Sequence, residues 1–89
     1  MRSVHIIVHG LVQGVFFRQH TQEKALELGI NGFVRNIPDG TVEIDATGTN
    51  EALETLVAWC KEGPPHAEVT YIDMHEVPLK NFSSFKIIR

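Results

Sequence analysis

Branched apolar residues occupy every second position over residues 4–9. The positions that share one face are Val4, Ile6 and Val8. Because successive side chains of a strand point to opposite faces, this alternation predicts a strand with one buried face. His5 and His9 fall on the other face, which an antiparallel sheet can leave to solvent.

A helix is predicted over residues 18–28, after a loop at residues 10–17. Its apolar positions recur at helical spacing, and they are Phe17, Thr21, Ala25 and Leu28. Gly29 follows directly and is a typical C-terminal stop for a helix.

Two more strand-like runs, residues 30–36 and 41–47, flank the segment Ile37-Pro38-Asp39-Gly40. Pro, Asp and Gly favour a tight turn, so the two runs are predicted to form an antiparallel hairpin. The apolar positions of the second run are Val42, Ile44 and Ala46. Glu43 and Asp45 alternate with them and are expected as solvated charges on a polar face.

The strongest helical pattern follows Thr49 or Asn50, either of which can cap it, and ends before Gly63-Pro64-Pro65. Its apolar stripe consists of Leu53, Leu56, Val57 and Cys60. Two strand candidates, residues 68–77 and 84–88, close the chain.

The predicted order is β-α-β-β-α-β with a short extra strand. This order is typical of an α+β, ferredoxin-like split βαβ sandwich, in which both helices pack on one face of an antiparallel sheet. At 89 residues, we expect one domain, residues 1–89. The fold hosts many functions and does not by itself identify one.

Composition narrows the classes of function. The formal net charge of −3 argues against a nucleic-acid partner, because such domains usually carry a basic surface. No apolar run reaches membrane-spanning length, and the first residues lack the apolar region of a signal peptide, so no membrane partner is expected. A single cysteine, Cys60, permits no internal disulfide and suits a reducing cytoplasm, where we expect the protein. The length is compatible with a monomer, which we expect.

The segment before the first helix has the composition of an anion site. Gly14 allows a positive φ and close backbone approach, so successive N–H groups can point at one ligand. The first turn of the following helix adds free N–H groups and the positive end of its dipole. Arg18 supplies a planar fork that matches phosphate geometry.

Two segments resemble the signatures of a known family. Residues 8–18, Val-His-Gly-Leu-Val-Gln-Gly-Val-Phe-Phe-Arg, are similar to the first signature of the acylphosphatase family. Residues 32–36, Gly-Phe-Val-Arg-Asn, with Gly40-Thr41-Val42 and Gly48, are similar to the second. The two signatures occur in the expected order without gaps, and the length is that of a stand-alone member.

The resemblance implies that acyl phosphates are hydrolysed to a carboxylate and inorganic phosphate, which is product and inhibitor, with no cofactor and no metal. It implies that Arg18 binds the phosphoryl group and that Asn36 positions the attacking water. It also implies that the loop backbone holds the phosphate oxygens, through Gln13, Gly14, Val15, Phe16, Phe17 and Arg18.

The residues fit this chemistry. Carboxylic acids have a pKa of about 4, so a carboxylate leaves without a general acid at neutral pH. Phosphoryl transfer depends mainly on positioning and charge stabilisation. Two alternatives stay open: a module that binds phosphate or acyl phosphate without turnover, and a ferredoxin-like RNA binder, which would need exposed aromatic residues and a basic face.

Other residues with chemical potential have simpler interpretations. His5 and His9 share a face but are about 13 Å apart along a strand, too far to share one metal ion. The remaining histidines, His20, His66 and His75, have no ligand spacing. Cys60 is expected as a small core residue. Arg35 points away from Asn36 by alternation, and a second contribution to the anion site is left open.

Overall fold

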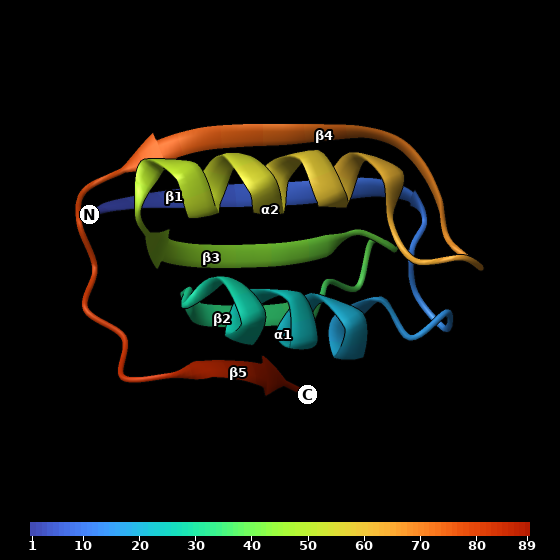
Figure 1. The fold of residues 1–89 in the computed structure, drawn as a ribbon. Coiled ribbons are helices and arrows are strands. Elements are labelled where there is room, and N and C mark those ends of the chain that lie inside the picture. Colours follow the sequence, from blue (N-terminus) through green and yellow to red (C-terminus); the bar gives the residue numbers. More distant parts are fainter.

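Seven elements follow one another in the computed structural model, which describes residues 1–89. Their bounds are β1 (Arg2–Leu11), α1 (Phe17–Leu28), β2 (Asn31–Asn36), β3 (Val42–Gly48), α2 (Asn50–Glu62), β4 (Glu68–Val77) and β5 (Phe85–Ile88) (Figure 1). The element order and types match those predicted, with ends displaced by one or two residues. Helix α1, for example, begins at Phe17 instead of Arg18.

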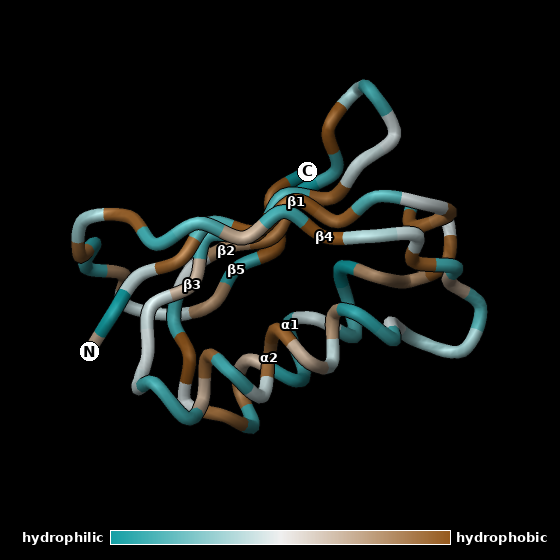
Figure 2. The backbone as a smooth tube through the Cα atoms, turned by 90° about the horizontal axis from the view of Figure 1, so that it is seen from above, coloured by the Kyte–Doolittle hydropathy of each residue, from teal (hydrophilic) through white to brown (hydrophobic).

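The five strands form one sheet in the order β4-β1-β3-β2-β5. Figure 2 shows both helices on the same side of this sheet. The predicted α+β ferredoxin-like sandwich is therefore confirmed. The sheet is mixed and not wholly antiparallel, because β5 pairs in parallel with β2. The chain after β4 crosses the sheet to the opposite edge, and it enters β5 in the direction of β2.

The buried core lies between the helices and the sheet. The register sets Ile6 opposite Ile44, and Ile44 opposite Val34, so the alternating residues of three strands meet on the helix side. From the helices, the core receives Phe17, Ala25, Leu53, Leu56 and Cys60. The predicted buried faces of the first strand and the hairpin are confirmed.

Local signals set the helix ends. Thr49 is the N-cap of α2, and its side chain accepts a hydrogen bond from the N–H of Ala52. Gly29 ends α1 in the left-handed conformation, and its N–H bonds the carbonyls of the last turn. Neither helix has the length and hydropathy needed to cross a membrane.

The face of the sheet away from the helices is polar, but it is less solvated than predicted. The side chain of Asp45 is only 6% exposed, because Lys80 and the segment that joins β4 to β5 cover it. Lys80 Nζ lies 3.1 Å from Asp45 Oδ2. Glu43 is 16% exposed and pairs with both His5 and Arg35. The expectation that Glu43 and Asp45 are freely solvated is wrong, because a long-range chain crossing covers Asp45 and two ion-pair partners shield Glu43.

The ion pairs of Glu43 make stability depend on pH. Burial raises the pKa of Glu43, but the hydrogen bonds with His5 and Arg35 outweigh it, and the net pKa lies below the usual 4.5. A lowered pKa in the folded state stabilises the protein above pH 4.5. This stabilisation is lost as the pH falls through the folded-state value.

We therefore expect Glu43→Gln to lower the free energy of unfolding at pH 7 by about 1 kcal/mol. The difference from the unmodified protein should shrink as the pH drops below 4.5. Urea denaturation at a series of pH values measures both effects. Glu62→Gln, at an exposed position without an ion pair, is the control. A pH-independent difference for Glu43→Gln would contradict the assignment.

Candidate functional site

The direction of the strands brings two chain segments together at one end of the sheet. Strand β3 pairs antiparallel with both β1 and β2. Strands β1 and β2 therefore run in parallel, and their C-terminal ends lie at the same end of the sheet. Val42 of β3 pairs with Val8 on one side and with Asn36 on the other. The loop that follows β1 and the turn that follows β2 therefore lie at the same end of the molecule (Figure 1).

A bulge directs the chain out of β1 into this loop. The register with β4 shifts between His9 and Gly10. Gly10 has φ +127°, and an added Cβ would lie 2.1 Å from the carbonyl oxygen of Glu68. Only glycine fits such a close backbone approach, so the exit from β1 is fixed by this residue.

The loop of residues 12–16 turns its backbone through two left-handed residues. Gly14 has φ 74°, and Phe16, with φ 62°, is the only non-glycine residue with a positive φ. Alternating conformations of this kind turn successive N–H groups toward one point. No hydrogen bond within the protein uses the backbone N–H groups of residues 13–18. These donors are therefore free to bind a ligand.

The start of α1 adds positive potential to the same place. Its N-cap, Phe16, has no side chain that can accept a hydrogen bond, and the first turn contains no acidic residue. Nothing within the protein offsets the dipole at this helix end. Arg18 lies in this first turn, is partly buried and takes part in no ion pair or side-chain hydrogen bond. The arrangement suits an anion.

Asn36 faces the same side of the sheet. It shares its register position with Val42 and Val8, whose side chains are buried against the helices, so its side chain is on the helix side. Its Oδ1 atom is buried and has no hydrogen-bond partner. A buried unpaired oxygen is costly, and it is common at sites where a ligand or water completes the bonding.

A further contact was not predicted from sequence. The side chain of Gln13 donates hydrogen bonds from Nε2 to the carbonyl oxygens of Ile37 (2.7 Å) and Thr41 (2.8 Å). The family resemblance in the sequence implies a role only for the backbone of Gln13. Its side chain joins the 12–16 loop to the turn that follows Asn36, so all predicted site residues lie at one end of the sheet.

Comparison with known proteins gives a consistent assignment. The acylphosphatase family model matches residues 4–87. The acylphosphatase of Methylococcus capsulatus is 47% identical over 90 residues, which cover 100% of this chain and 98% of that protein. The crystal structure of acylphosphatase from Bacillus subtilis superposes with a TM-score of 0.97 at 40% identity, over 100% of both chains.

The chain belongs to the acylphosphatase family. The resemblance found in the sequence is thus confirmed, and so is the prediction of an acylphosphatase enzyme, a hydrolase. The chain also superposes on one segment of full-length HypF, in its phosphate- and nucleotide-bound form, and this segment is 12% of the HypF chain. That match covers 99% of this chain, with a TM-score of 0.87 and 27% identity.

Arg35 takes no part in this acylphosphatase-type site. Its guanidinium pairs with Glu43 on the sheet face away from the helices. The possibility of a second charge contribution at the anion site, which the sequence left open, therefore has no support in the geometry.

His5, His9 and Cys60 also have their partners or surroundings outside the site. His9 bonds Asp73 at 3.1 Å and stacks on Tyr71, and His5 bonds Glu43 at 2.7 Å. No group of three or more His, Cys, Asp or Glu side chains is placed to hold a metal ion. Burial raises the pKa of the Cys60 thiol to about 12, which suits a packing role in the core. The cytoplasmic location inferred from this single cysteine stays a prediction.

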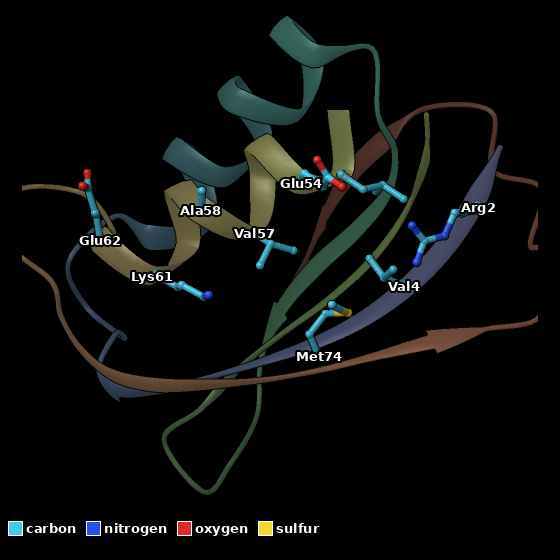
Figure 3. A pocket seen from close by; sticks show the side chains of 9 residues that line it. Arg2, Val4, Glu54, Val57, Ala58, Lys61, Glu62 and Met74 are labelled. Carbon is cyan, nitrogen blue, oxygen red and sulfur yellow. The ribbon is translucent and has the colours of Figure 1, made fainter. Parts of the chain in front are cut away.

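The largest cavity is separate from the anion site. It has a volume of about 410 Å³ and lies between α2 and strands β1 and β4 (Figure 3). Its lining includes the apolar residues Val57 and Met74 and the basic residues Arg2 and Lys61. Arg2 begins β1, whereas the 12–16 loop follows the other end of that strand. The candidate anion site consists instead of the free backbone N–H groups of residues 13–18.

Titration with inorganic phosphate tests the site without any assay of activity. We expect the ¹⁵N–¹H resonances of residues 13–18 to shift with a common saturation curve, because their free N–H groups gain an acceptor. The resonances of residues on the sheet face away from the helices, such as Glu43, should not shift. Arg18→Gln should weaken this binding by about tenfold, the loss of one or two charge-assisted hydrogen bonds. Unchanged loop resonances at saturating phosphate would exclude the site.

Proposed function

We propose that this enzyme hydrolyses the carboxyl–phosphate bond of acyl phosphates to a carboxylate and inorganic phosphate. The phosphoryl group binds the backbone N–H groups of residues 13–18 and the guanidinium of Arg18, and Asn36 positions the attacking water. One observation carries the proposal: unused donors and the unpaired Oδ1 of Asn36 lie at the same end of the sheet, on a chain of this family.

The donors match the charge of the reaction. In the loose transition state of phosphoryl transfer, negative charge is spread over three equatorial oxygens. Fixed N–H dipoles stabilise such charge without reorganising during the reaction. The helix dipole and Arg18 add to this field. A protein with a net charge of −3 thus attracts an anion through local groups alone.

Asn36 supplies the acceptor that a water needs. A carboxamide oxygen accepts a hydrogen bond and does not ionise, so Asn36 can orient a water over the whole neutral pH range. The unpaired Oδ1 is the atom suited to this role. Because the transition state is loose, little deprotonation of the water is required before attack.

The leaving group explains why an acid–base pair is unnecessary. The water oxygen forms a bond to phosphorus as the bond from phosphorus to the acyl oxygen breaks. The carboxylate leaves as an anion with a conjugate-acid pKa of about 4, so it requires no proton. The protons of the water pass to phosphate and solvent.

Capture of phosphate or acyl phosphate without turnover is the second candidate. The likeness to a segment of the much larger HypF, seen in a phosphate-bound form, shows that this fold also occurs as one part of a larger protein. Detectable phosphate binding without hydrolysis would favour this function for the present chain.

Comparison of two substrates tests the proposed reaction directly. We expect turnover of benzoyl phosphate and, at the same enzyme concentration, at least about a thousandfold less turnover of a phenyl phosphate monoester, whose leaving group is far more basic. Activity should be unchanged by a chelator, since the site relies on backbone and Arg18. Preference for the monoester, or loss of activity in chelator, would contradict the mechanism.

Two substitutions separate the proposed roles. Arg18→Gln should lower kcat/KM by roughly a thousandfold and weaken inhibition by phosphate, because an arginine of this kind stabilises the phosphoryl group. Asn36→Ala should lower kcat by about a hundredfold with phosphate inhibition nearly unchanged, because the interaction with water matters in the transition state. Steady-state kinetics with phosphate as inhibitor measures both. Equal weakening of phosphate inhibition in the two variants would refute this division.

A further inference from the structure

The side chain of Gln13 connects the two halves of the site. Its Nε2 donates to the carbonyl oxygens of Ile37 and Thr41, at 2.7 and 2.8 Å. A primary carboxamide has two N–H protons, so these two bonds use both of them. The residue is partly buried, and such bonds hold a side chain in one orientation.

The turn that accepts these bonds is already closed by its own contacts. The N–H of Ile37 bonds the carbonyl of Thr41 at 2.9 Å, and the N–H of Gly40 bonds the carbonyl of Ile37 at 3.0 Å. Asp39 Oδ1 accepts from both the N–H and the hydroxyl of Thr41, and these bonds lower the pKa of Asp39. Both carbonyls therefore have a partner without Gln13. What Gln13 adds is a connection between the turn and the 12–16 loop.

The loop has few other attachments. The carbonyl of Phe16 accepts from the N–H of His20, and this is the only backbone hydrogen bond of residues 13–16 outside the regular elements. Val12 is buried in the core and anchors the start of the loop. Val15 packs partly against the core, but the amide of Gln13 supplies the only side-chain hydrogen bonds between these residues and the turn.

Asn36 lies immediately before Ile37, one of the two acceptors. We propose that Gln13 is a positioning residue, whose side-chain amide fixes the distance between the anion-binding backbone and the carboxamide of Asn36. The inference rests on the proposed function. It assigns Gln13 a role through its side chain, separate from the role of its backbone N–H.

This geometry predicts how loss of the hydrogen bonds between Gln13 and the turn would change the kinetics. The phosphate-binding groups all belong to the loop and to α1, so they keep their mutual arrangement when the link to the turn is lost. The water held by Asn36 would no longer be aligned with the phosphorus atom. Small misplacements of a reacting group cost up to about a hundredfold in rate. Removal of the link should therefore lower kcat and leave phosphate binding nearly intact.

A double-mutant cycle tests the link. Gln13→Met keeps the length of the side chain and removes both donors. We expect it to lower kcat by about tenfold to a hundredfold and to change the inhibition constant of phosphate by less than about twofold. In an Asn36→Ala background, Gln13→Met should change kcat by less than about twofold, because the two residues act as one unit. An equal loss of kcat in both backgrounds would overturn the proposal.

Gln22→Met is the matched control. Gln22 also donates from Nε2 to a backbone carbonyl, that of Phe85 at 3.0 Å, but it joins α1 to β5, away from Asn36. We expect Gln22→Met to lower thermal stability to a similar extent and to leave kcat unchanged. A drop in kcat equal to that of Gln13→Met would show that any loss of stability lowers turnover, and it would overturn the proposal.

A readout without turnover keeps this inference separate from the proposed reaction. Absence of hydrolysis by the unmodified protein would refute the reaction alone. The link is then tested by the side-chain amide resonances of Asn36 during titration with inorganic phosphate. They should shift in the unmodified protein, whereas in Gln13→Met the loop N–H groups still shift and the Asn36 response is lost or reduced. A full Asn36 response in Gln13→Met would overturn the proposal.

Discussion

The parallel course of β1 and β2 is the constraint on which the site depends. Neither strand touches the other, and β3 between them sets their direction and their register. Val42 of β3 pairs with Val8 on one side and with Asn36 on the other. A slip of one residue between β2 and β3 would therefore turn Asn36 to the polar face. The hydrophobic core fixes this register, because the same slip would take Val34 of β2 out of the core. The packing that stabilises the fold therefore also aims the carboxamide.

The second requirement of the site is a positive potential in an acidic protein, and it is met by backbone groups. The N–H groups of residues 13–18 are free, α1 has no side-chain cap, and Arg18 is the only charged side chain in this segment. Ordinary helices begin with a residue that caps these donors, as Thr49 does for α2. The contrast between the two helices of this small domain separates a structural helix end from one left open for a ligand.

Much of the fold could be predicted from the sequence, because local patterns determine it. Alternation in residues 4–9, the Pro-Asp-Gly turn and the Thr49 cap each act within a few residues, and each prediction is confirmed. The features that could not be predicted depend on contacts between residues far apart in the sequence. The parallel pairing of β5 with β2 and the covering of Asp45 by Lys80 depend on a chain crossing that no local pattern encodes. The side-chain bonds of Gln13 are of the same kind, since their acceptors lie 24 and 28 residues away.

Phe16 shows where local preference and the site disagree. A bulky residue with φ 62° is strained by about 1–2 kcal/mol. Phe16 is 68% exposed, so burial does not compensate for the strain. The conformation is held from both sides by the core contacts of Val12 and Phe17. A relaxed φ at Phe16 would turn the N–H groups of the loop away from a common point. In the proposed site, this strain is the energetic cost of keeping several donors directed at one ligand, and the packing of Val12 and Phe17 in the core allows it to persist.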